Sequence, residues 1–145
     1  MTLGWHSVVT WALILGGWYA VHLATLSRER RKERRDASKA SIEAISALAA
    51  EAREFHIAVD FDANRADLLR YKTERLIRSL QRPPLQYLDI SVAKMVKLRK
   101  SITLKNAELS SFSSQRADSL ILQEIRTATD DLIDSIEEER EARWE

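Results

Sequence analysis

The sequence contains no cysteine, and its few glycines and prolines are confined to two short stretches. Without cysteine, disulfide frameworks, thiolate metal sites and cysteine nucleophiles are excluded. The glycines are Gly4, Gly16 and Gly17, and the prolines are Pro83 and Pro84. Because strand-rich folds need frequent turns, usually built with Gly, Pro or Asn, this distribution predicts an all-α fold.

Charged residues are absent from the first part of the chain. No Asp, Glu, Lys or Arg occurs between Met1 and Leu26, and the stretch from Trp5 onward is mostly apolar. A helix needs roughly 20 apolar residues to cross the hydrocarbon core of a bilayer. A secretory signal peptide has a shorter apolar core with basic residues before it, whereas here the basic residues follow the core. We therefore expect residues 1–26 to form an N-terminal tail and a single transmembrane helix.

Basic residues dominate the juxtamembrane segment that follows, residues 27–36. Since basic flanks stay on the cytoplasmic side of a span, we expect the N-terminus outside and the body in the cytoplasm of a bacterial-type inner (plasma) membrane. The same side chains are expected to contact anionic membrane lipid. Nucleic acid is disfavoured as a partner because Glu29 and Glu33 interrupt the segment and no aromatic residue lies within it. The basic residues are Arg28, Arg30, Arg31, Lys32, Arg34 and Arg35.

Small residues recur every four positions within the expected span. They are Ala12, Gly16, Ala20 and Ala24, which fall on one side of a helix. Such stripes allow two helices to approach closely in lipid, where packing drives association. The stripe therefore predicts packing between two spans, and a homodimer is the first expectation.

In residues 37–145, apolar residues follow the alternating three-and-four spacing of coiled-coil helices. This spacing predicts a cytosolic helical region whose first helix continues from the span to Gln81. Pro83 and Pro84 predict a turn at 82–84, since proline disfavours helical geometry in the residue before it and lacks a backbone donor. The residues expected at a coiled-coil seam are Ile45, Leu48, Phe55, Val59, Leu69, Leu76, Leu88, Met95, Leu98, Ile102, Ile125 and Leu132.

The serine-rich run at 110–114 leaves two arrangements open after that turn. Serine weakens helices because its hydroxyl competes for backbone hydrogen bonds. If the run breaks the helix, the chain forms a three-helix bundle. If the helix continues, the chain forms a long antiparallel helical hairpin, with its acidic C-terminal residues beside the basic residues 28–35. In both arrangements Val92 and Val96 lie off the seam, and unpaired apolar surface of this kind implies a partner.

The body contains little that suggests catalysis. No nucleotide-binding, hydrolase or metalloprotease motif occurs. His56 and Asp60 lie four residues apart, which predicts a surface pair rather than a metal site, because no further His or Cys is near. Asp62 falls at a seam position, where we expect it to fix helix register. We expect no enzymatic activity, no metal and no cofactor.

These features predict a single-pass inner-membrane anchor or scaffold protein. Its coiled coil would self-associate and bind a partner protein, which is either another membrane protein or a cytosolic one. The alternative is a small membrane effector, such as a pore-forming or toxin-like subunit, whose cytosolic helices control assembly of the spans. A third and less favoured class is a nucleic-acid tether that uses residues 28–35 and the basic residues Lys94, Lys97, Arg99 and Lys100.

Overall fold

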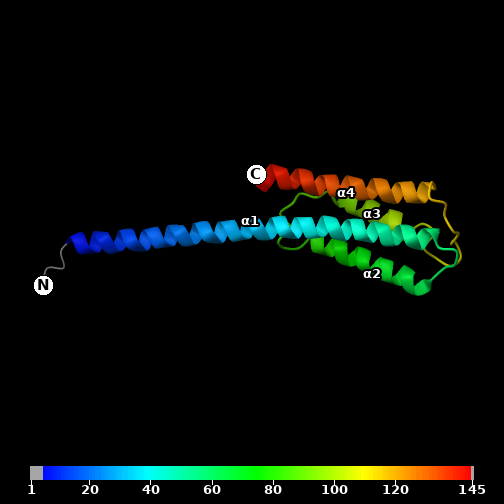
Figure 1. The fold of residues 1–145 in the computed structure, drawn as a ribbon, viewed down its shortest axis with the longest axis horizontal. Coiled ribbons are helices and arrows are strands. Elements are labelled where there is room, and N and C mark those ends of the chain that lie inside the picture. Colours follow the sequence, from blue (N-terminus) through cyan, green and yellow to red (C-terminus); the bar gives the residue numbers. More distant parts are fainter. Residues whose placement is uncertain (1–4, 145) are drawn as a thin grey trace. The chain divides into compact units, whose positions relative to one another are not determined.

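A computed structural model of the chain describes residues 5–144, and within this range it forms four α-helices and no strand (Figure 1). The helices are α1 (Trp5–Ile57), α2 (Ala63–Leu80), α3 (Val92–Thr103) and α4 (Leu120–Trp144). The predicted all-α fold is therefore confirmed. The chain divides into two compact units, Met1–Arg34 and Arg35–Glu145, and α1 contributes residues to both.

The first unit contains the apolar part of α1. A window of this helix has a mean hydropathy of 1.4, and none of it is buried against other parts of the protein. Large side chains of this segment, such as Trp11, Leu15, Trp18 and Val21, are exposed. Among the described residues, α1 is the one helix that is long and apolar enough to span a membrane.

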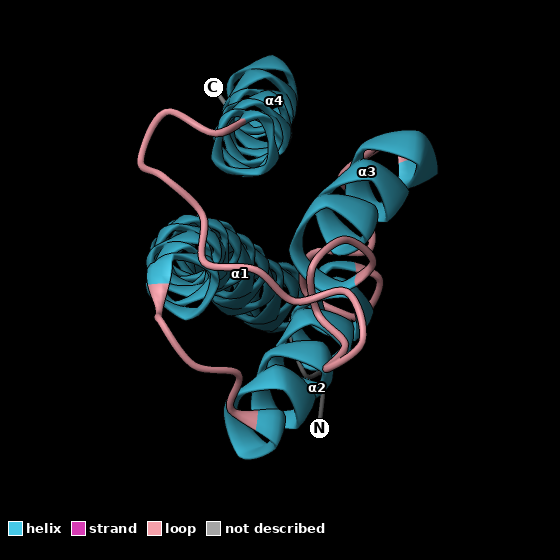
Figure 2. Ribbon diagram, turned by 90° about the vertical axis from the view of Figure 1, so that its right-hand side faces the viewer, coloured by secondary structure: helices cyan, strands magenta, loops and turns pink. Residues whose placement is uncertain are grey.

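The second unit is a bundle made of α1 residues 35–57 together with α2, α3 and α4. Consecutive helices run in opposite directions, and α3 packs between α2 and α4 (Figures 1 and 2). The Lys72 ammonium binds Glu51 at 2.7 Å and so links α2 to α1. Lys97 likewise binds Asp131, which links α3 to α4. The bundle alternative is therefore closer to the structure than the long hairpin, with one helix more than the sequence suggested.

The predicted helix through Gln81 is wrong, because α1 ends at Ile57 and the chain reverses over residues 58–62. The reversal is stabilised by Asp62, whose carboxylate accepts hydrogen bonds from the backbone N–H groups of Asn64 (2.9 Å) and Arg65 (3.1 Å). An aspartate at this position caps the start of α2 by satisfying donors that have no partner in the first helical turn. Asp62 is thus a helix cap and not a seam residue.

The long hairpin does not form, because α3 ends at Thr103 and α4 begins at Leu120. The serine-rich run 110–114 lies inside the connection between them. The other connection, between Leu80 and Val92, contains the residues 82–84 at which a turn was predicted.

The core of the bundle contains side chains from all four helices. Ile45, Leu98, Ile125, Leu132 and Ile136 have no exposed surface. Of the residues predicted for a coiled-coil seam, all but Val59 are buried in this core. Val59 lies in the reversal after α1 and is 83% exposed, because the helix on which its seam position depended has already ended.

Candidate functional site

The stripe of small residues in the apolar part of α1 is open on the helix surface. Ala12, Gly16, Ala20 and Ala24 are all exposed. A Cβ atom added at Gly16 would meet no other atom within 4 Å. Nothing in the described part of the chain therefore covers the stripe, and a second helix can approach it.

The juxtamembrane segment 27–36 lies within α1. Arg28, Arg30, Arg31, Lys32 and Arg35 are exposed, whereas Arg34 is half-buried. Exposed cations that follow a span are suited to contact with anionic headgroups, each at about 1 kcal/mol near a charged membrane surface.

The bundle carries a groove of about 570 Å³ between α3 and α4, here called the α3–α4 groove. Its apolar part includes Val96 and Leu104, which are 41% and 70% exposed, and Val92 on the same side of α3 is 62% exposed. Large apolar side chains that remain exposed together commonly mark a binding surface. The complete lining is Ala93, Val96, Lys97, Lys100, Ser101, Leu104, Lys105 and Glu124.

Three of the lining residues are lysines, and Glu124 is the one acidic residue among them. Lys105 binds Glu124 at 2.8 Å, and Lys97 binds Asp131. The hydrogen bond from Lys97 also lowers the pKa of the Asp131 carboxyl. Lys100 forms no ion pair within the described residues, so its charge remains available. The groove therefore combines apolar contact area with an excess of positive charge.

Asn106 lies at the end of the α3–α4 groove that the loop after α3 forms. It directly follows the lining residues Leu104 and Lys105. Asn106 adopts a left-handed backbone conformation with φ of 56°. Its amide oxygen accepts a hydrogen bond from the Ser113 N–H, and its Nδ2 donates to the Ser113 carbonyl at 2.9 Å. These contacts close the loop after α3 and hold its first residues in place.

His56, in the last turn of α1, anchors the same loop from inside the bundle. Its Nδ1 lies 3.2 Å from Asn106 Nδ2, and its Nε2 lies 3.3 Å from the Ile102 carbonyl oxygen. These partners fit the neutral ring, in which Nδ1 accepts a hydrogen bond from Asn106 and Nε2–H donates one to Ile102. Burial lowers the pKa of His56, and the hydrogen bond to Ile102 offsets this only in part.

The surface pair predicted for His56 and Asp60 is wrong, because His56 has no exposed surface. It lies beside the aromatic cluster of Phe55, Phe61 and Phe112, whose ring centroids are 5.5 to 6.0 Å apart. No local sequence pattern indicates this environment, since Asn106 is 50 residues away from His56.

The described residues contain no group of three or more His, Cys, Asp or Glu side chains that could hold a metal ion. Their buried side-chain nitrogen and oxygen atoms all have hydrogen-bond partners. Comparisons of the chain with protein-family models, curated proteins and solved structures found no match.

Proposed function

We propose that the protein is a single-pass membrane anchor whose helical body holds a partner protein on the α3–α4 groove. The observation that carries this proposal is the pairing, in one short chain, of an exposed apolar helix with a bundle that keeps an apolar groove open between lysines. The span supplies attachment to lipid, and the groove supplies recognition.

The orientation follows from the basic juxtamembrane segment. Cations directly after a span favour retention of that side in the cytoplasm. The body, residues 37–145, therefore belongs in the cytoplasm and the N-terminus outside, in a membrane of the bacterial inner (plasma) type. Anionic lipid is the expected ligand of Arg28, Arg30 and their neighbours.

The chemistry of the α3–α4 groove indicates the kind of partner it takes. An amphipathic helix could place apolar residues on Val96 and Leu104 and an acidic side chain on Lys100. Fully burying a side chain of this size stabilises a complex by about 1.5–3 kcal/mol. A partner helix with acidic residues beside its apolar stripe would thus match both the shape and the charge of the groove.

A second copy of the bundle matches the groove poorly. Two α3 faces brought together would oppose lysine with lysine, which is unfavourable. The acidic outer face of α4, with Asp130 and Asp134, has the right charge, but Ile133 beside them is half-buried against the core. Self-association of the protein is therefore assigned to the small-residue stripe of the span, and the groove to a different protein.

A photo-crosslinking amino acid placed at Val96 or at Leu104 tests the groove in intact membranes. We expect both positions to yield the same discrete adduct with an acidic amphipathic helix, and Lys100→Glu to abolish it. Leu68, which is 48% exposed on α2, is the control position. No discrete adduct at either groove position, or an equal one at Leu68, would refute the assignment of the groove.

The alternative function is a membrane effector that assembles through its spans, and the open surface at Gly16 favours it. Inducing the protein while recording membrane potential separates the two functions. An anchor leaves the potential unchanged. Rapid depolarisation that disappears in Gly16→Ile would replace the anchor proposal with the effector.

A further inference from the structure

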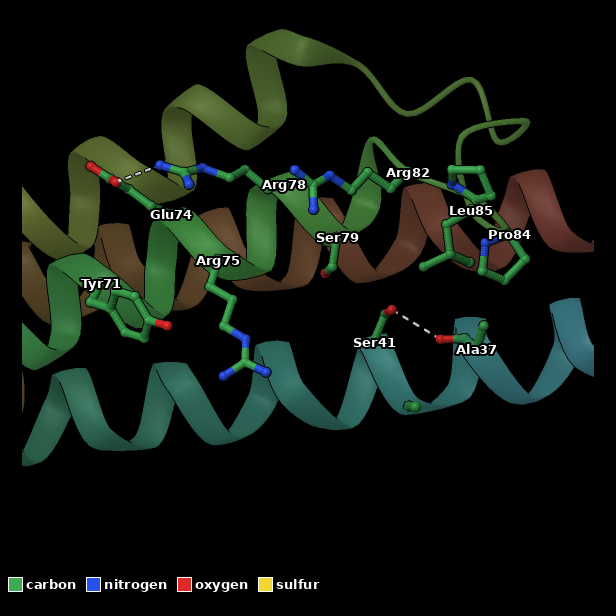
Figure 3. A pocket seen from close by; sticks show the side chains of 12 residues that line it. Ala37, Ser41, Tyr71, Glu74, Arg75, Arg78, Ser79, Arg82, Pro84 and Leu85 are labelled. Carbon is green, nitrogen blue, oxygen red and sulfur yellow. Dashed lines mark hydrogen bonds and ion pairs between the residues drawn. The ribbon is translucent and has the colours of Figure 1, made fainter.

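A second groove, of about 560 Å³, lies between α1 and α2 beside the turn that follows α2 (Figure 3). Three arginines line it, Arg75 and Arg78 from α2 and Arg82 from the turn, and we call it the arginine groove. Glu74 is its only acidic lining residue. This groove is separate from the α3–α4 groove, with which it shares no lining residue.

The charge of Glu74 is already compensated by two cations. Arg78 Nη2 lies 3.3 Å from one oxygen of Glu74, and Arg99 Nη2 from α3 lies 3.7 Å from the other. Arg75 and Arg82 form no ion pair with any described residue. The arginine groove therefore contains two guanidinium groups that lack a counter-charge from the bundle.

The position of Arg75 is not explained by helix stability. Cations in the last turn of a helix are favoured by its dipole, which accounts for Arg78 and for Arg82 just beyond the end of α2. Arg75 lies a turn earlier, and its side chain extends from α2 toward α1 rather than toward a carboxylate (Figure 3). Like charges one turn apart on a helix repel one another, so these arginines would be stabilised by an anion.

The remaining lining separates donors from apolar contacts. The Ser41 hydroxyl donates to the Ala37 carbonyl at 2.9 Å, and the Ser79 hydroxyl donates to the Leu76 carbonyl at 2.7 Å. Both serine hydroxyls therefore donate hydrogen bonds within their own helices. The guanidinium groups remain as the charged donors of the groove. Pro84 and Leu85 provide apolar surface at the end near the turn (Figure 3).

We propose that the arginine groove binds a phosphate ester, whose phosphate is attracted by the uncompensated charges of Arg75 and Arg82 and whose apolar group lies against Pro84 and Leu85. The planar guanidinium group offers paired N–H donors that match two phosphate oxygens at once. Either an anionic phospholipid or a soluble phosphate ester supplies this chemistry. The inference does not depend on the partner of the α3–α4 groove.

The test uses the full chain in neutral detergent micelles and two probes. One probe is phenyl phosphate, and the other is short-chain phosphatidylglycerol, with short-chain phosphatidylcholine as its zwitterionic counterpart. Binding is followed by the NMR signals of the arginine Nε–H groups and by calorimetry. Saturable binding of either anionic probe, with shifts at Arg75 and Arg82, is expected, and the probe that binds more tightly identifies the source.

The matched variants are R75A/R82A and R116A/R126A, which remove the same charge from different places. Arg116 and Arg126 are exposed and lie outside the arginine groove. Loss of charge-assisted hydrogen bonds should weaken binding by about tenfold or more in R75A/R82A only. R75K/R82K keeps the charge but not the fork geometry, and should bind at intermediate strength.

Three results would overturn the proposal: no saturable binding of either probe, equal weakening in both double variants, or full binding in R75A/R82A. Equal weakening would show a diffuse charge effect that includes the basic segment 27–36. Circular dichroism verifies that each variant is folded, and if R75A/R82A does not fold, R75K/R82K carries the comparison. Unchanged affinity in R75K/R82K would then count against the bidentate contact.

Discussion

The Nδ1 atom of His56 lies 3.2 Å from the Nδ2 atom of Asn106, although 50 residues separate them in the chain. This contact joins the end of α1 to the loop that leaves α3. Because Leu104 and Lys105 directly precede Asn106, the contact also supports one end of the α3–α4 groove. Stability of the bundle and shape of the groove are therefore expected to change together when either residue is altered.

Acidification is expected to destabilise the bundle through His56. Burial lowers its pKa below the ordinary value of 6.5, so below that pH the unfolded chain binds more protons than the folded one. Stability contributed by the neutral ring is thus present above pH 6.5 and is lost as pH falls toward the lowered pKa, at up to about 1.4 kcal/mol per pH unit. A protonated Nδ1 could no longer accept the hydrogen bond from Asn106.

Thermal unfolding of the full chain in detergent, followed by circular dichroism across this pH range, measures the effect. His56→Leu has no group to titrate at this position and should lose much of the pH dependence, even if it is less stable overall. The same slope in wild type and His56→Leu would assign the acid sensitivity to other groups.

Asn106 is expected to be more sensitive to alanine than to glycine. Both variants lose the hydrogen bonds to Ser113 and His56, each worth about 1 kcal/mol. Alanine in addition must adopt the left-handed conformation at φ of 56°, which costs roughly 1 kcal/mol more and which glycine adopts freely. Unfolding midpoints should therefore fall in the order wild type, Asn106→Gly, Asn106→Ala. A reversed order of the two variants would show that backbone conformation is not limiting here.

The cap of α2 gives a smaller and local effect. Asp62→Ala removes the acceptor for the Asn64 and Arg65 N–H groups and should reduce the free energy of unfolding by about 1 kcal/mol. Asp67→Ala is the matched control, since the Asp67 carboxylate pairs with Arg70 alone among the described residues, and that pair is exposed. Its loss should change the free energy of unfolding by less than about 0.5 kcal/mol. Equal losses in chemical denaturation would argue against capping.

Asp62 also shows where sequence reasoning succeeded and where it failed. The apolar spacing correctly indicated helices and, through residues such as Ile45 and Leu98, which side chains are buried. The same spacing wrongly predicted that the first helix continues through residues 58–62, because Phe55, Val59 and Ala66 keep helical spacing across the reversal. An Asp can sit within a helix or cap the next one, and only the tertiary contacts of α2 with α1 decide between these states.

Only part of the candidate sites could be predicted from the sequence. Val92 and Val96 departed from the seam, which anticipated exposed apolar surface on α3. The buried pair of His56 and Asn106 depends on a contact across 50 residues, and the arginine groove depends on the return of α2 along α1. Neither feature arises from local spacing, so the sequence pattern alone does not indicate it.

Self-association through the span is tested by two neighbouring glycines. Neither Gly16 nor Gly17 has an atom within 4 Å of an added Cβ, so isoleucine at either site should leave the single chain unperturbed. Only Gly16 lies on the stripe with Ala12 and Ala20. Gly16→Ile should therefore lower energy transfer between labelled copies in bilayers, whereas Gly17→Ile should not. Equal behaviour of the two variants would exclude the stripe as the interface.

Membrane attachment itself is expected to depend on the apolar part of α1. Leu15 is exposed near the middle of this segment, and an arginine there raises the insertion free energy by about 2.5–3.5 kcal/mol. Leu15→Arg should thus increase the fraction of protein released from membranes by alkaline extraction. Leu68→Arg places the same charge on an exposed site of α2 and should leave the membrane fraction unchanged. If Leu68→Arg were released as readily as Leu15→Arg, or if neither were released, attachment would depend on another part of the chain, since only a segment within the hydrocarbon makes an arginine costly at one site and harmless at the other.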